Sequence, residues 1–285
     1  MKDVAFISCF FNPANFIKPV KNCISFMEHT VGKKFPANDF FFAQIECDGI
    51  THVDATKYIP KGNYFHIKSD SILWHKERLF NLLIDKFNLY DKYNYICWMD
   101  ADILFASSIK GLDTKKIDAF QPFKVSIRQA DKTGKESFTI DSWAENPKDS
   151  SDIGLSWGIK SSILKSVGGF FDYGILGGGD TVMAYRMSKR EMKFGCEKLD
   201  EEVALYFKND YIKRERVAAL NNTVTHLFHG KIKNRQYNER VKILKKYKYN
   251  PLEDLTVEKN GLYRLINKEF EAEIKNYFLN RKEDE

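Results

Sequence analysis

Two acids separated by a single residue interrupt an apolar run at residues 95–105, and acids at this spacing could take part in the chemistry of a site. Asp100 and Asp102 follow residues 95–99. Carboxylates are rarely buried unless they are paired or hold a metal. Because side chains alternate along a strand, both acids would point to one side of an extended backbone and engage one divalent ion. A strand end with solvated or capping carboxylates is the alternative, since an isolated Asp-x-Asp triplet is a weak motif.

A second acid stands beside a run of glycines. Gly177, Gly178 and Gly179 precede Asp180, and a helical pattern follows at residues 182–187. Glycines let another molecule approach the backbone closely, and Asp180 can cap the helix. A flexible turn with a cap is the alternative interpretation.

Two histidines end an alternating strand at residues 224–230. His226 and His229 are three residues apart, so on an extended strand they face opposite ways, and we expect only one to reach a given ligand. A core histidine is the alternative for either. The basic, amide-rich segment 231–240 follows and would place phosphate-binding donors beside them.

The elements that would position these residues follow an α/β pattern. Residues 4–11 and 40–45 are continuous apolar runs, which predict strands buried on both faces, and residues 16–29 have the spacing of an amphipathic helix between them. Polar residues follow the second run, at the place where ligands bind beyond the carboxyl ends of strands. Residues 72–87 predict another helix, whose charged first turns have a solvated face as the alternative.

Two further segments complete the organisation. Residues 111–152 alternate short apolar pieces with turn-prone residues and predict a long lid or binding loop. We expect residues 1–245 to form a catalytic domain and residues 246–285 a helical extension, of which residues 281–285 should fray.

Composition narrows the classes of protein. The chain has 285 residues and a formal net charge of +6, which is too small and dispersed to demand a nucleic-acid partner. Its five cysteines form no C-x-x-C pair, which predicts buried free thiols in a reducing compartment. The start of the chain lacks the pattern of a signal peptide, and no apolar stretch approaches the roughly 20 residues of a membrane span. We therefore expect a cytoplasmic protein.

Taken together, the order of these parts resembles the GT-A class of nucleotide-sugar-dependent glycosyltransferases, family 2-like with a galactosyltransferase-type C-terminal region. Residues 98–102 match the D-x-D motif of that class. Residues 168–172 and 177–180 look like its "GGF-D … G-ED" segment, although Gly179-Asp180 stands where two acids are common. The resemblance spans roughly residues 4–240 and implies an α/β fold with a mixed, mostly parallel central sheet flanked by helices.

The resemblance also implies roles for individual residues. Asp102 and His229 would hold a divalent metal, Mn²⁺ or Mg²⁺, with Asp100 and His226 as further candidate ligands, and Asp180 would be the catalytic base. The residues that we expect to bind the nucleotide-sugar donor are Phe11, Asn12, Glu46, Asp48, Trp74, Lys76, Arg78, Asp100, Gly178, Gly179, Lys231, Asn234, Arg235 and Tyr237.

The implied function is a metal-dependent, inverting glycosyltransferase of the hexosyltransferase type that uses a UDP-sugar. The acceptor stays open among a glycan, a lipid-linked sugar, a protein hydroxyl and a modified DNA base. A nucleotidyltransferase is one alternative, but the first strand lacks a Gly-rich, Lys-containing phosphate loop. A non-catalytic carbohydrate-binding or scaffold protein is the other.

Overall fold

The centre of the molecule is a seven-stranded mixed sheet. The computed structural model describes residues 2–47, 49–50, 53–109, 112–113, 115–188, 190–208 and 212–285. The strand order is β10-β6-β9-β4-β1-β2-β3, with all neighbours parallel except β9, which is antiparallel to β4 and β6. The bounds are β1 Lys2–Phe10, β2 Phe40–Glu46, β3 Tyr64–Lys68, β4 Tyr93–Met99, β6 Ala119–Gln121, β9 Ser156–Lys160 and β10 Val217–Ala219. The predicted mixed, mostly parallel sheet is confirmed.

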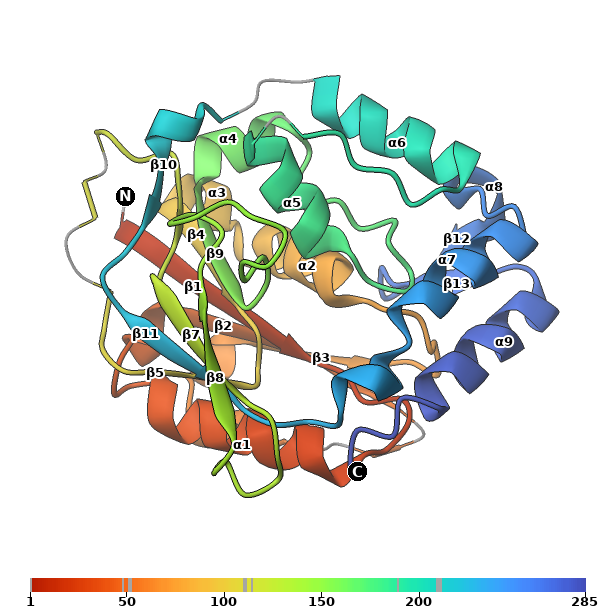
Figure 1. Ribbon diagram of the computed structural model, residues 1–285, viewed down its shortest axis with the longest axis horizontal. Coiled ribbons are helices and arrows are strands. Elements are labelled where there is room, and N and C mark those ends of the chain that lie inside the picture. The colour runs from red at the N-terminus through yellow and green to blue at the C-terminus, as the bar shows by residue number, and fades with distance from the viewer. Residues whose placement is uncertain are drawn as a thin grey trace.

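Helices cover both faces of this sheet because its central strands are apolar on both sides. In β1, Ala5 and Ile7 pack into one hydrophobic cluster, which includes residues of α2 (Lys76–Phe87). Phe6 and Phe10 pack into another, which includes residues of α1 (Ile17–Thr30). Figure 1 shows α1 and α2 on opposite sides of β1. The continuous apolar run of β1 is thus explained by burial on two faces.

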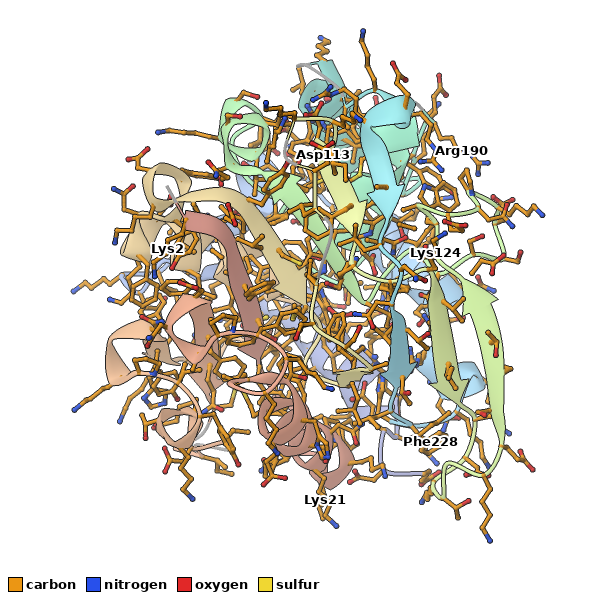
Figure 2. All side chains as sticks on the ribbon, turned by 90° about the vertical axis from the view of Figure 1, so that its left-hand side faces the viewer. Lys2, Lys21, Asp113, Lys124, Arg190 and Phe228 are labelled. Atoms are coloured by element: carbon orange, nitrogen blue, oxygen red, sulfur yellow. The ribbon has the colours of Figure 1, made fainter. Side chains whose placement is uncertain are left out.

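A second sheet of four short strands stands at one edge of the molecule, in the order β5-β11-β7-β8. Its strands are β5 Ile103–Phe105, β7 Val125–Gln129, β8 Ser137–Asp141 and β11 Thr223–His226. Lys124 and Phe228, labelled in Figure 2, lie at opposite ends of this sheet. The prediction of a long loop over residues 111–152 is therefore wrong. β7 and β8 are short, and β8 is mostly exposed, so these two strands lack the apolar alternation that reveals a strand.

The remaining helices are mostly short. They are α3 Leu89–Lys92, α4 Ser161–Ser166, α5 Gly179–Ser188, α6 Glu197–Lys208, α7 Tyr237–Lys246, α8 Pro251–Asp254 and α9 Lys268–Leu279. Single 3₁₀ turns span Ala37–Asp39, Ala55–Lys57, Lys61–Asn63, Arg214–Arg216 and Ile232–Arg235. Among the described residues, we find no helix that combines the length and apolarity needed to cross a membrane.

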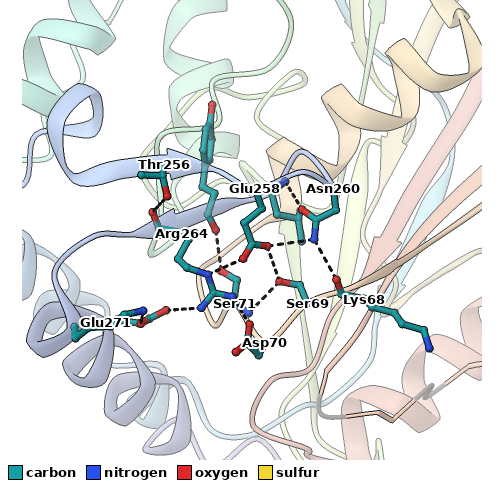
Figure 3. A network of polar contacts seen from close by, with 12 residues as sticks. Lys68, Ser69, Asp70, Ser71, Thr256, Glu258, Asn260, Arg264 and Glu271 are labelled. Carbon is teal, nitrogen blue, oxygen red and sulfur yellow. Dashed lines mark hydrogen bonds and ion pairs between the residues drawn. The ribbon is translucent and has the colours of Figure 1, made fainter.

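Residues 246–285 contain a two-stranded hairpin besides helices, formed by β12 (Leu255–Val257) and β13 (Tyr263–Leu265). Arg264 fixes it to the chain after β3 by pairing with Asp70, while its Nε donates to Glu258 at 2.6 Å (Figure 3). The segment shares a hydrophobic cluster with Ile72, Leu73 and α5. The domain boundary at residue 245 stays a prediction.

The end of the chain is ordered by specific contacts, so the prediction that residues 281–285 fray is wrong. Arg281 is only 5% exposed. Asp284 accepts hydrogen bonds from the backbone N–H groups of Ile17 and Lys18, at the start of α1. Figure 1 shows the C-terminus beside that end of α1.

Candidate active site

A cavity of about 720 Å³ opens at the carboxyl ends of β1 and β4. Its wall combines residues from both sheets, the glycine-rich turn before α5 and the segments around α7 and α9. The predicted site residues that line it are Phe11, Trp74, Lys76, Asp100, Asp102, Gly178, Asp180, His226, His229, Arg235 and Tyr237. Segments far apart in sequence thus meet where ligands bind in α/β sheets.

Asp102, His226 and His229 form a compact cluster in this cavity. Asp102 Oδ2 lies 3.0 Å from His229 Nε2 and 3.5 Å from His226 Nε2, and the two Nε2 atoms are 3.2 Å apart. One ligand atom from each residue lies within 4.8 Å of the others. The three side chains can therefore converge on one ion.

The expectation that only one histidine would reach the site is wrong. β11 ends at His226, which pairs with Ile103 of β5, the residue directly after Asp102. The chain then leaves the strand, and the Leu227 N–H donates to the Asp102 carbonyl at 2.9 Å. The alternation of an extended strand therefore no longer applies at His229, which turns back to face His226.

The protonation states of the cluster suit a metal. Burial raises the pKa of Asp102, but the two imidazoles outweigh it and hold that pKa well below its usual range. Burial lowers the pKa of His226 to about 4. An ionised carboxylate and a neutral imidazole are the forms that bind metal ions. The other carboxylate oxygen, Asp102 Oδ1, is buried without a hydrogen-bond partner, so these residues fit a divalent cation.

Asp100 lies apart from this cluster, in a second group of charges around Lys76. Lys76 Nζ lies 3.2 Å from Asp100 Oδ1 and 3.9 Å from Glu77 Oε1. Burial raises the pKa of Asp100 to about 6, although Lys76 opposes the shift. Burial likewise raises the pKa of Glu77 to about 7. The structure thus brings Asp100 to the cavity but pairs it with Lys76 rather than with the histidines.

Asp180 stands at the first turn of α5, facing the cavity. Its Oδ1 accepts the N–H of Thr181 at 2.8 Å. Gly154 lies against the carboxylate, because a Cβ at that position would be 2.9 Å from Asp180 Oδ2. Gly179 packs on Glu77, where a Cβ would be 2.4 Å from Glu77 Cδ. The lack of side chains at these two glycines lets the carboxylates of Asp180 and Glu77 approach the turn.

Several predicted donor-binding residues do not line the cavity. Glu46 pairs with His66 at 3.1 Å, and Arg78 pairs with Asp172 at 3.2 Å. The Asn12 side chain bonds to the backbone of Phe16 and shapes the loop after β1. Gly179, Lys231 and Asn234 are also outside the lining, and Asp48 lies outside the described residues.

Six charged residues that line the cavity were not among the predicted site residues: Arg128, Asp149, Asp152, Arg240, Arg281 and Glu283. Arg128 is adjacent to His226 in the register of β7 and β11, and its guanidinium pairs with the buried carboxylate of Asp152. Recognising β7 as a strand would have indicated that Arg128 lies beside His226. The sequence gives no indication that Arg281 and Glu283 line the cavity, because their charged segment resembles a solvated tail.

Comparisons with known proteins give structural likeness alone. No protein-family model matches the chain, and no curated protein matches it. Among solved structures, S. aureus TarS 1–349 has 10% identity and a TM-score of 0.39, over 98% of this chain and 71% of that one. The same fragment in complex with UDP has 11% identity and a TM-score of 0.39, over 86% and 68%.

GalNAc-T7 with UDP, GalNAc and Mn²⁺ has 10% identity and a TM-score of 0.40, over 80% of this chain and 44% of that one. Because all these TM-scores lie below 0.5, the proposed function is based on the residues of this chain alone. The chain has a mixed α/β fold, and an acid–histidine cluster lines the cavity at the carboxyl ends of β1 and β4.

Proposed function

We propose that this protein is a metal-dependent glycosyltransferase of the GT-A class, which moves a sugar from a nucleoside-diphosphate sugar to an acceptor hydroxyl. The observation that carries the proposal is the cluster of Asp102, His226 and His229, with a buried carboxylate oxygen that has no partner. Asp180 and several cationic side chains line the same cavity. A metal site, a base and phosphate-binding donors are the groups that such a transfer needs.

The cationic side chains that line the cavity would bind the leaving group. A departing nucleoside diphosphate carries negative charge, which guanidinium groups bind well because their donors match phosphate oxygens. Arg128 and Arg235 lie beside the metal-binding cluster, and Tyr237 is within 3.2 Å of Arg235. We assign binding of the diphosphate to these three residues, and Arg240 also lines the cavity.

A divalent ion held by the cluster would stabilise the same developing charge as a Lewis acid. Two imidazoles beside one carboxylate favour Mn²⁺ over Mg²⁺, which prefers an all-oxygen shell. Phe11 follows β1 and Trp74 precedes α2; their rings meet edge to face at 5.2 Å and would bound the nucleobase. Asp100 would face the ribose or the sugar. The assignment of uracil as the base rests on the resemblance of the sequence.

Asp180 would accept the proton of the acceptor hydroxyl as it attacks the anomeric carbon. Direct attack opposite the leaving diphosphate inverts the configuration at that carbon. The Lys76 ammonium balances the charges of Asp100 and Asp180, so that several carboxylates can share one cavity. The acceptor remains one of the four classes given above, and the five buried free thiols support a reducing, cytoplasmic location.

A donor panel tests this function. Purified protein is incubated with nucleoside-diphosphate sugars and Mn²⁺, and the released nucleotide is identified by chromatography. We expect slow release of a nucleoside diphosphate, and faster release when an acceptor is present. Release of pyrophosphate would identify a nucleotidyltransferase instead. If the protein neither binds nor turns over any of the donors, the proposal is contradicted.

A further inference from the structure

The guanidinium of Arg128 is held along one edge by a buried carboxylate. Arg128 lies on β7, next to His226 in the register with β11, and lines the cavity. Its Nε donates to Asp152 Oδ2 at 2.9 Å, and its Nη2 donates to Asp152 Oδ1 at 2.5 Å. Two parallel hydrogen bonds to one carboxylate fix the plane of a guanidinium as well as its position. The orientation of Arg128 is therefore set by Asp152.

This pairing leaves the outer edge of the guanidinium for a ligand. A guanidinium carries five N–H donors in a planar fork, and Asp152 accepts from two of them on the Nε–Nη2 edge. The adjoining Nη1–Nη2 edge presents a second parallel pair of N–H groups, which matches two oxygens of a phosphate. The Asp152 side chain has no exposed surface, whereas that of Arg128 is 21% exposed. The part of the pair that a ligand can reach is thus the guanidinium.

Asp152 is itself fixed from several sides. Ser126, also on β7, donates from its Oγ to Asp152 Oδ2 at 2.5 Å. The Asp152 backbone N–H donates to the Asp141 carbonyl at 2.8 Å, and the Asp152 carbonyl accepts from Trp143 N at 3.0 Å. A carboxylate held through both its backbone and its side chain does not follow the movements of its partner. Asp152 is thus a fixed support for the guanidinium.

We propose that Asp152 is a positioning residue for the diphosphate of the donor and acts through Arg128, whose Nη1–Nη2 edge it directs at the phosphate oxygens. The proposal rests on the binding of a nucleoside diphosphate in the proposed function. Its effect has the opposite sign to that of charge alone. The Asp152 carboxylate repels a diphosphate, so neutralising it would strengthen binding if Asp152 did not orient Arg128.

The experiment uses the full chain and measures UDP binding in the presence of Mn²⁺ by calorimetry. Asp152→Asn removes the charge and one acceptor, since an amide accepts through one oxygen only. Asp118→Asn is the matched control, because Arg216 donates to Asp118 through the same Nε–Nη2 edge outside the cavity lining. Arg128→Gln and the double variant with Asp152→Asn complete a mutant cycle. Thermal unfolding shows whether each variant is folded.

We expect Asp152→Asn to weaken UDP binding by about 10-fold, the effect of one hydrogen bond to a charged group, and Asp118→Asn to leave it unchanged. In the Arg128→Gln background, Asp152→Asn should have no further effect. Unchanged or tighter UDP binding by folded Asp152→Asn would overturn the positioning role. A full second loss in the double variant would overturn it as well, because Asp152 would then act without Arg128.

The orientation of Arg128 is also measured without ligand, in ¹⁵N spectra of the arginine guanidinium groups. Ligand-free wild type should give separate Nη1 and Nη2 signals for Arg128, which are identified by their loss in Arg128→Gln and should merge in Asp152→Asn. A single averaged Nη signal in the folded wild type would overturn the proposal even if Asp152→Asn does not fold. Separate signals in a wild type that does not bind UDP would support the orientation by Asp152 and contradict the proposed donor.

Discussion

The Nε2 atoms of His226 and His229 lie 3.2 Å apart, and both face Oδ2 of Asp102. Two imidazoles from the end of one strand thus meet the acid that precedes its antiparallel neighbour. The arrangement depends on the chain leaving β11 directly after His226. It makes both histidines functional candidates and leaves Asp100 to pair with Lys76.

Both histidines should contribute to metal binding. His226→Gln and His229→Gln are each expected to weaken Mn²⁺ binding by at least ~10-fold, equivalent to about 1.4 kcal/mol, since each removes one ligand. His66→Gln, which changes a histidine paired with Glu46 outside the cavity, is the control. Titration of free Mn²⁺ by electron paramagnetic resonance measures the effect. Full affinity in His226→Gln, with loss only in His229→Gln, would show a site with one histidine.

Gly154 should affect the transfer rate, because it lies against the carboxylate of Asp180. Asp180→Asn is expected to lower the transfer rate by roughly 10²–10⁴-fold while donor affinity changes little, because a general base acts on the acceptor. Gly154→Ala should give a smaller loss of the same kind, since its Cβ would be 2.9 Å from Asp180 Oδ2 and would displace it. Gly62→Ala, which meets no atom within 4 Å, is the control. Equal losses of donor binding and transfer would remove Asp180 from the base role.

Glu77 should make the stability of the protein depend on pH. Burial raises the pKa of Glu77 from 4.5 to about 7, so the folded state keeps a proton that the unfolded state has released. Its contribution to stability therefore falls as the pH rises from about 4.5 to about 7. Glutamine stays neutral, so Glu77→Gln should gain on the order of 3 kcal/mol over the wild type between pH 4.5 and pH 8.

Urea unfolding at pH 5 and pH 8 measures this difference, with the exposed Glu136→Gln as control. We expect the control to follow the wild type at both pH values. Parallel changes in the wild type and Glu77→Gln would show that Glu77 titrates near its ordinary value.

Asp284 should stabilise α1 from a distance of more than 260 residues in sequence. Asp284→Ala is expected to lower the free energy of unfolding by about 1 kcal/mol, the usual effect of losing a helix cap. Glu285→Ala removes a neighbouring exposed acid and should have little effect. Chemical denaturation compares the two variants, and equal stabilities would mean that the Asp284 contacts contribute nothing measurable.

The central strands β1, β2 and β4 were predictable because burial on both faces leaves continuous apolar runs such as residues 4–11. The three-residue strands β6 and β10 were not, because they are too short to leave such a run. The smaller sheet was not, because β7 and β8 are short and partly exposed. Arg128 was missed for that reason. A periodic pattern reports burial, and these strands bury too little to produce one.

The site was predictable where acids or glycines interrupt apolar runs, as at Asp102 and Asp180, because such interruptions are costly without a function. The pairing of His226 with His229 was not, because it depends on where β11 ends. Glu283 and Arg281 come from a charged segment whose sequence predicts solvation, and their burial depends on contacts with α1 and Trp74 that only the folded chain shows.

The most direct test of the central claim compares wild-type protein with Asp102→Asn in one assay of nucleoside-diphosphate release from a UDP-sugar. Both proteins are first shown to be folded, and each is assayed with Mn²⁺ and with a chelator. We predict release by the wild type only with Mn²⁺, and none by Asp102→Asn under either condition. Release that persists in the chelator, or in folded Asp102→Asn, would contradict a metal site built on Asp102.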